Sequence, residues 1–250
     1  MTATVLEVTG LFKAFGGIGA VAGVSFHVDA GELVALIGPN GAGKTTCFNL
    51  INGQLAPDAG AIALSGEHLE GLPPREIARR GVSRTFQVAA TFASMTVREN
   101  IQMALIARDD REASVIARAT DLRRVEADAL LDRVRMTRFA DQGCATLAYG
   151  DAKRAELALA LAGRPRLLLM DEPTAGMSPR SRTRLMELAV TLARQENLAV
   201  LFTEHDMDIV FRHADRVIVL DRGRIIAEGT PEAIRADAQV QAAYLGTDGP

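Results

Sequence analysis

The fold of this chain is decided by one short stretch, Gly38-Pro39-Asn40-Gly41-Ala42-Gly43-Lys44-Thr45. It fits the pattern GxxxxGK followed by Ser or Thr, and it lies between an apolar run at residues 33–37 and a helical pattern at about 44–52. In that order of strand, loop and helix, glycines turn backbone N–H groups onto phosphate oxygens, and the helix dipole adds to the attraction. Lys44 would reach the terminal phosphates and the Thr45 hydroxyl would ligate Mg²⁺. The stretch, together with Thr46 after it, is therefore predicted to bind a nucleotide.

A pair of acids, Asp171-Glu172, ends a second apolar run at residues 167–170. Ligands of parallel sheets bind at the carboxyl ends of the strands. Asp171 is therefore placed to hold Mg²⁺ through water, and Glu172 to orient and deprotonate the attacking water. Alone, such a pair is weak evidence, but after a phosphate-binding loop it favours nucleotide hydrolysis.

The rest of the chain alternates strand and helix patterns, which predicts an α/β fold with a parallel sheet covered on both faces. Residues 96–138 form an exception, because they read as helical throughout, with one apolar stripe and a charged, solvated face. Further strands are predicted at 5–8, 24–28, 61–64, 199–202, 217–220 and 224–228, and further helices at 74–80, 181–194 and 207–213.

The composition argues against several classes of protein. A formal net charge of −3 is unlike the basic surfaces that bind nucleic acid. The two cysteines, Cys47 and Cys144, belong to no CxxC or Cys/His cluster, which favours a reducing compartment over a disulfide framework or zinc site. We see no signal peptide and no apolar run near the ~20 residues of a membrane span. If the protein works at a membrane, another subunit must hold it there.

Several further motifs follow one another in an order that resembles the nucleotide-binding subunits of ABC transporters. The likeness covers essentially the whole chain, and within the family it is most similar to the ATPases of branched-chain amino-acid importers. The motifs of the whole family are the Gln87 that ends Arg84-Thr85-Phe86-Gln87, then Leu147-Ala148-Tyr149-Gly150-Asp151, the acid pair, Ala175-Gly176-Met177-Ser178, and His205. Those of the branch are Gly81 to Gln87, Met95 to Asn100, Glu228 to Pro231, and Tyr244 to Gly246.

That resemblance implies a P-loop NTPase fold with a RecA-like parallel-sheet core, an N-terminal antiparallel β subdomain and an inserted helical subdomain. The whole chain, 1–250, would be a single ABC ATPase domain. Residues 1–87 and 164–250 would form the core with its β subdomain, and about 88–163 the helical subdomain. ATP and Mg²⁺ would be its cofactors, and ATP hydrolysis coupled to transport its activity.

The resemblance also assigns roles to single residues. Phe15 would stack on adenine, although a place in the core at a strand edge is nearly as good a reading. Gln87 would touch Mg²⁺ or the attacking water and sense the γ-phosphate, and His205 would contact that phosphate. Ala148, Tyr149 and Gly150 would cap the γ-phosphate of an ATP bound to the opposite subunit of a dimer.

This last segment departs from the family pattern, which reads Leu-Ser-Tyr-Gly-Gln in the branch. Ala148 lacks the serine hydroxyl, whose hydrogen bond to a charged acceptor is worth roughly 1.5–3 kcal/mol. Asp151 suits the first turn of a helix but would repel a polyphosphate. We therefore favour a heterodimer in which the partner supplies an intact segment, while a homodimer with a weakened site stays open.

The implied setting is the cytoplasmic face of the inner membrane, where the chain would bind peripherally to permease subunits served by a periplasmic or extracellular substrate-binding protein. Urea or amide import and lipopolysaccharide export are alternatives within the family. Other classes fit less well. A DNA-repair ATPase would carry long coiled-coil insertions, and a translation-associated protein would hold two cassettes. A non-hydrolysing or weakly hydrolysing ATP-dependent scaffold would not need Glu172 and His205, but Ala148 and Asp151 keep that alternative open.

Overall fold

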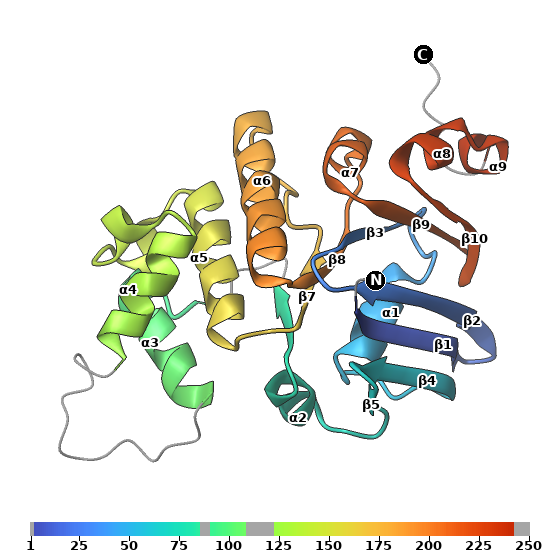
Figure 1. Cartoon of the computed structure of the whole chain (residues 1–250), viewed down its shortest axis with the longest axis horizontal. Helices are drawn as coiled ribbons and strands as arrows, with labels where there is room; N and C mark the ends of the chain where they lie inside the picture. The colour runs from blue at the N-terminus through green and yellow to red at the C-terminus, as the bar shows by residue number, and fades with distance from the viewer. Residues whose placement is uncertain (1–2, 86–90, 109–122, 243–250) are drawn as a thin grey trace.

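A computed structural model describes residues 3–85, 91–108 and 123–242 of the chain (Figure 1). Its centre is a six-stranded sheet with the order β10-β9-β3-β8-β7-β6, in which all neighbours are parallel except β10 and β9. The strands are β3 (Leu33–Ile37), β6 (Val82–Thr85), β7 (Leu167–Asp171), β8 (Ala199–Thr203), β9 (Arg216–Asp221) and β10 (Arg224–Gly229). The predicted parallel sheet is confirmed.

The central strands are buried on both faces, so their side chains pack into two hydrophobic cores, one on each face of the sheet. In β3, Leu33, Ala35 and Ile37 belong to one core, whereas Val34 and Leu36 belong to the other. The alternation follows from the pleat, because successive side chains of a strand point to opposite faces. A continuous apolar run is therefore the sequence signature of these strands.

An antiparallel sheet forms the second layer, with α1 (Lys44–Ile51) between it and the central sheet (Figure 1). Its order is β2-β1-β4-β5. The first two strands are much longer than the sequence pattern indicated, because register shifts interrupt the apolar alternation that marks a strand. The strands are β1 (Thr4–Phe15), β2 (Ile18–Asp29), β4 (Ala59–Leu64) and β5 (Glu67–His68).

Helices cover the other face of the central sheet, and three of them, α3, α4 and α5, form a lobe at one end of the molecule (Figure 1). Whether a subdomain begins and ends at about 88 and 163 stays a prediction. Among the described residues, no helix is both long and apolar enough to span a bilayer. The remaining helices are α2 (Pro74–Arg79), α3 (Val97–Arg108), α4 (Arg124–Arg133), α5 (Tyr149–Ala162), α6 (Pro179–Glu196), α7 (Met207–His213), α8 (Pro231–Ala236) and α9 (Ala238–Val240), with short 3₁₀ turns at Thr137–Phe139 and Cys144–Thr146.

The prediction of helix throughout 96–138 was wrong after Arg133. There the chain ends α4 with two backbone hydrogen bonds, from Arg135 N to Asp132 O and from Met136 N to Leu131 O. These are the paired bonds of a Schellman helix end, in which the first residue past the cap takes a left-handed conformation. Arg135 does so, with φ of 57°. This helix end could not be predicted, because the position of Arg135 normally holds glycine.

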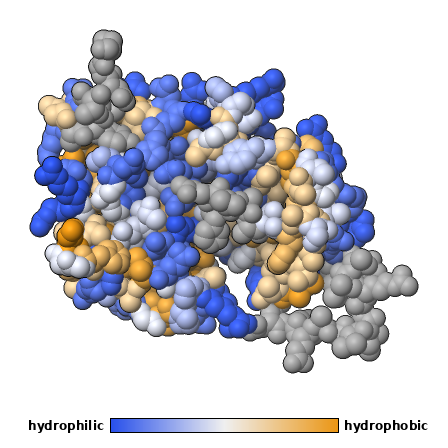
Figure 2. All heavy atoms as spheres, turned by 180° about the vertical axis from the view of Figure 1, so that it is seen from behind, coloured by the Kyte–Doolittle hydropathy of each residue, from blue (hydrophilic) through white to orange (hydrophobic). Residues whose placement is uncertain are grey.

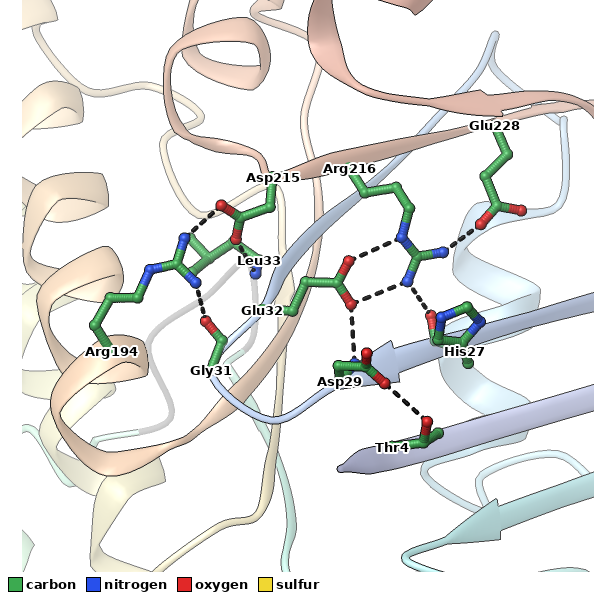
Figure 3. Close-up of polar contacts among 10 residues, drawn as sticks. All are labelled: Thr4, His27, Asp29, Gly31, Glu32, Leu33, Arg194, Asp215, Arg216 and Glu228. Carbon is green, nitrogen blue, oxygen red and sulfur yellow. Dashed lines mark hydrogen bonds and ion pairs between the residues drawn. The ribbon is translucent and has the colours of Figure 1, made fainter. Parts of the chain in front are cut away.

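A network of polar contacts ties the two sheets together at the amino ends of the parallel strands (Figure 3). The Arg216 guanidinium donates to both oxygens of Glu32, at 2.8 and 2.9 Å, to the His27 carbonyl at 2.7 Å, and to Glu228. Next to it, Arg194 pairs with Asp215, which also accepts from the Leu33 N–H. The contacts join β2, β3, β9, β10 and α6, so they fix how the antiparallel sheet sits on the core.

Candidate nucleotide-binding site

The predicted phosphate loop connects the end of β3 to the start of α1, and close packing forces its shape. Gly38 and Gly43 have φ of 149° and 107°, a region that L side chains rarely adopt. A β-carbon at Gly38 would lie 2.1 Å from the Leu220 carbonyl oxygen, and one at Gly43 would lie 2.3 Å from that of Ala20. Only glycine fits at these two positions, so the turn of the loop is fixed by its contacts with β9 and β2.

Lys44 lies at the first position of α1 and is 8% exposed. Its Nζ donates to the carbonyl oxygens of Gly38 at 2.6 Å and Pro39 at 3.1 Å, so the ammonium folds back over the loop. Burial lowers the pKa of Lys44, while the charges of Glu172 and Asp171 act in the opposite direction. The Lys44 ammonium therefore interacts electrostatically with both carboxylates. Of the hydroxyl residues that follow it, Thr45 is exposed and Thr46 half-buried.

The acid pair ends β7, as predicted, and neighbouring strands hold its first member. Asp171 is buried, and its two oxygens accept from the Thr203 hydroxyl on β8 at 2.8 Å and from Arg84 Nη2 on β6 at 2.6 Å. Thr203 also accepts from the Glu172 N–H at 3.0 Å. Carboxyl ends of three adjacent parallel strands thus converge on one carboxylate, the place where such sheets bind ligands.

Glu172 and His205 form a pair beside Asp171. Glu172 has a left-handed backbone with φ of 46°, and its Oε1 lies 2.9 Å from His205 Nε2. Their side chains are 25% and 45% exposed, so the pair is open to solvent. A carboxylate held by an imidazole in this way is suited to take a proton from a water molecule.

The loop that carries His205 is anchored by residues that the sequence did not single out. Glu204 is buried and accepts from the Thr174 N–H at 2.8 Å. Burial raises the pKa of Glu204, against the hydrogen bonds that lower it. Arg182 donates to Asp206 at 2.6 Å and to the Met177 carbonyl at 2.8 Å, which ties the segment 175–178 to this loop. The sequence feature that could have pointed to Glu204 is its position, an acidic residue between the buried strand β8 and His205.

Arg84 is a further residue that sequence reasoning missed, since it served only as part of a motif. Besides Asp171, it donates to Asn49 Oδ1 on α1 at 2.6 Å and to Gln54 Oε1 at 3.2 Å. Its guanidinium lies 5.6 Å from the centre of the Phe48 ring. The charge of Arg84 inside a short buried strand was the available signal.

Phe15 and Gln87 are the two remaining residues of this chain that were predicted to contact its own nucleotide. Phe15 ends β1 and is 48% exposed, so its alternative place in the core is wrong. An exposed aromatic ring at a strand end remains suited to stacking on a base. Gln87 lies outside the described residues.

The segment Ala148-Tyr149-Gly150 begins α5, with Ala148 as the N-cap and Tyr149 half-exposed. Helices α5 and α1 lie on opposite faces of the central sheet (Figure 1). Within the described part of the chain, no polar contact joins this segment to the phosphate loop. Asp151 takes its expected place in the first turn of α5, where Arg154 pairs with its carboxylate.

The oxygen donors of the site fit a magnesium ion that is shared with phosphate. In the described ranges, His, Cys, Asp and Glu form no group of three or more that could enclose a metal. Mg²⁺ does not need one, because it is usually held by one or two carboxylates together with water and substrate phosphates. Asp171 and the Thr45 hydroxyl supply donors of that kind.

Comparison with known proteins identifies the family. Residues 21–175 match the family model described as ABC transporter. The chain belongs to the ABC transporter family. Residues 224–250 match a second model, described as branched-chain amino acid ATP-binding cassette transporter. As a member of this family the chain is an ATPase that binds ATP, and the predicted P-loop fold is confirmed.

Two relatives and one solved structure resemble it over nearly their whole lengths. The high-affinity branched-chain amino acid transport ATP-binding protein BraF of Pseudomonas aeruginosa is 42% identical, over 98% of this chain and 99% of the relative. The protein LivG of Escherichia coli, which carries the same description, is 41% identical over the same shares. The ADP conformation of MJ1267, an ATP-binding cassette of an ABC transporter, superposes with a TM-score of 0.86 and 29% identity, over 98% of this chain and all of that one.

Proposed function

We propose that this ABC ATPase drives the import of branched-chain or related amino acids from the cytoplasmic face of the inner membrane. The observation that carries the proposal is the convergence of Asp171, Glu172 and His205 beside the phosphate loop. The cargo rests on likeness to BraF and LivG, whose names describe transport of these amino acids. A periplasmic binding protein would deliver the cargo, and permease subunits would anchor the ATPase.

In the proposed mechanism the loop binds the phosphates of ATP through its backbone N–H groups, and Lys44 turns from the loop carbonyls to the terminal phosphates. Thr45, Asp171 and Gln87 would hold Mg²⁺, which would supply positive charge to neutralise the phosphate oxygens. Glu172 accepts the proton of the attacking water, and His205 keeps the carboxylate in position at 2.9 Å. ADP and phosphate leave, and the proton on Glu172 returns to solvent.

A second ATPase chain would complete the site. The segment from Ala148 to Gly150 begins α5, which lies on the opposite face of the central sheet from α1 and therefore does not reach this chain's own phosphate loop. Ala148 offers no hydroxyl to a phosphate on that chain. The charge of Asp151 is less repulsive than the sequence indicated, because Arg154 already pairs with it. The lost hydroxyl still favours a partner chain with an intact segment, which makes a heterodimer our proposal.

The permease would dock on a groove between α2, β6, α3 and α5. Two adjoining cavities, of about 330 and 310 Å³, share the apolar residues Ala78, Leu159 and Ala160 together with Ser83 in their lining. Apolar side chains also gather on the neighbouring α3–α5 lobe (Figure 2). Arg75, Arg79 and Arg108 also line the second cavity. A permease helix with an apolar face and acidic edges fits this surface.

The variant Glu172→Gln tests the proposal, because it removes the base and keeps the size of the side chain. We expect the purified protein to bind MgATP within about threefold of wild type and to lose at least ~100-fold in turnover. Cells that carry it should lose uptake of radiolabelled leucine and keep uptake of histidine. Near-normal turnover would contradict the role of Glu172, and normal leucine uptake beside lost turnover would contradict the cargo.

A further inference from the structure

We infer that Arg84 is a positioning residue for Asp171, a fixed counter-charge that sets how strongly nucleotide-bound Mg²⁺ is held. The inference rests on the proposed role of Asp171 toward Mg²⁺ and adds a residue that this role does not include. Arg84 pairs with side chains of its own chain, Asn49, Gln54 and Asp171. It acts through the carboxylate that it holds.

The first observation is the ion pair itself. Arg84 Nη2 lies 2.6 Å from Asp171 Oδ2, and the two side chains are 9% and 10% exposed. The other oxygen, Oδ1, accepts from Thr203. Both oxygens of the proposed metal acid are therefore occupied by donors of its own chain, one of them a full positive charge.

The second observation is that the guanidinium is anchored from the phosphate-loop helix. Asn49 accepts from Nη1 at 2.6 Å, Gln54 from the same atom at 3.2 Å, and Phe48 lies beside the guanidinium. Asn49 comes four residues after Thr45, so the two share one face of α1. The planar fork of arginine therefore lies on the same side of that helix as the hydroxyl proposed to meet Mg²⁺.

Two consequences follow from this placement. The positive charge holds the Asp171 carboxylate aligned before the nucleotide arrives, and it attracts ATP that carries no metal. It also repels a divalent cation near the same carboxylate and competes for Oδ2. Removing the charge should therefore weaken binding of metal-free ATP and strengthen binding of MgATP.

The measurable quantity is the ratio of the dissociation constants for ATP in EDTA and in excess Mg²⁺. For Arg84→Met we expect this ratio to rise about tenfold, the order for a unit charge acting on a divalent ion at a partly screened distance of several ångströms. Arg84→Lys keeps the charge and should stay within about twofold of wild type. Arg166→Met is the matched control, since Arg166 precedes the amino end of β7 and donates to the Arg80 carbonyl.

The experiment is competition of ATP with a fluorescent ATP analogue on the purified full chain, with and without Mg²⁺, beside a thermal melt of each variant. A ratio that rises in Arg84→Met and stays constant in Arg166→Met supports the inference; a ratio that is unchanged or falls overturns it. Should Arg84→Met fail to fold, Arg84→Gln also removes the charge while keeping a polar side chain, and it must shift the ratio in the same direction, or the inference is wrong. Asp171→Asn separates the two proposals: if Mg²⁺ still strengthens its ATP binding fully, the role of Asp171 itself fails.

Discussion

The two ends of the central sheet both carry clusters of charged side chains, but they use them differently. At the amino ends, Arg216 is bound by Glu32, Glu228 and a backbone carbonyl, so its donors face partners within the chain (Figure 3). At the carboxyl ends, Glu172 and His205 meet each other and remain open to solvent. The closed cluster is suited to hold the two sheets together, and the open one is suited to meet a ligand.

This contrast predicts that mutations at the two ends separate turnover from stability. A change in the open cluster should lower ATP hydrolysis and leave the melting temperature nearly unchanged. A change in the closed cluster should do the reverse. Active sites often sacrifice some stability for function, so their polar groups matter more for turnover than for the fold.

Among the changes that test this contrast, the largest effect is expected for His205→Ala. Loss of the imidazole frees the Glu172 carboxylate from its 2.9 Å contact, so turnover should fall about 100-fold, within the range of general-base effects. Steady-state ATPase assays and thermal melts measure the two sides of the comparison. His68→Ala is the control, because His68 is an exposed surface residue outside the site. A melting temperature that drops as far as activity does would show that His205 serves the fold.

The next effect concerns the closed cluster, through Arg216→Met. Removing the arginine leaves Glu32 and Glu228 without their shared cation, which we expect to cost about 2–3 kcal/mol of unfolding free energy. ATPase activity at 25 °C should stay within about twofold of wild type. Urea unfolding gives the free energy, and Arg224→Met, an exposed arginine at the start of β10, should change it by less than ~0.5 kcal/mol. Equal losses in both arginine variants would remove the distinction between the two ends.

The features that could be predicted from the sequence are those that can be read from consecutive residues. The phosphate loop is a local pattern in which spacing, glycines and flanking apolar runs are all readable along the chain. The ends of strands at Asp171 and Thr203 could also be placed, because buried parallel strands are continuous apolar runs. These features needed no knowledge of which strand lies beside which.

The parts that escaped prediction depend on neighbours in space. The pairing of Arg84 with Asp171 requires β6 to lie next to β7, and the contact of Arg216 with Glu32 requires β9 next to β3. The end of α4 escaped for another reason, because Arg135 takes a left-handed backbone that favours glycine. The order of strands and an unusual backbone are tertiary outcomes that a linear pattern does not carry.

The smallest expected effect is a gain, in Ala148→Ser, and it extends the comparison to the segment proposed to face a second chain. A serine at the N-cap of α5 would restore a hydroxyl donor to the partner's phosphate, and such a bond is worth roughly 1.5–3 kcal/mol at best. We expect ATPase activity of the complex to rise severalfold, limited by the repulsion left at Asp151. Ala152→Ser adds the same hydroxyl further along α5 and serves as the control. The phosphate-loop lysine of each chain is then replaced in turn. If only replacement of the partner's lysine abolishes the gain, the serine acts on the partner's ATP, as an asymmetric pair of sites requires. If a complex made of this chain alone shows the full gain, two identical chains suffice.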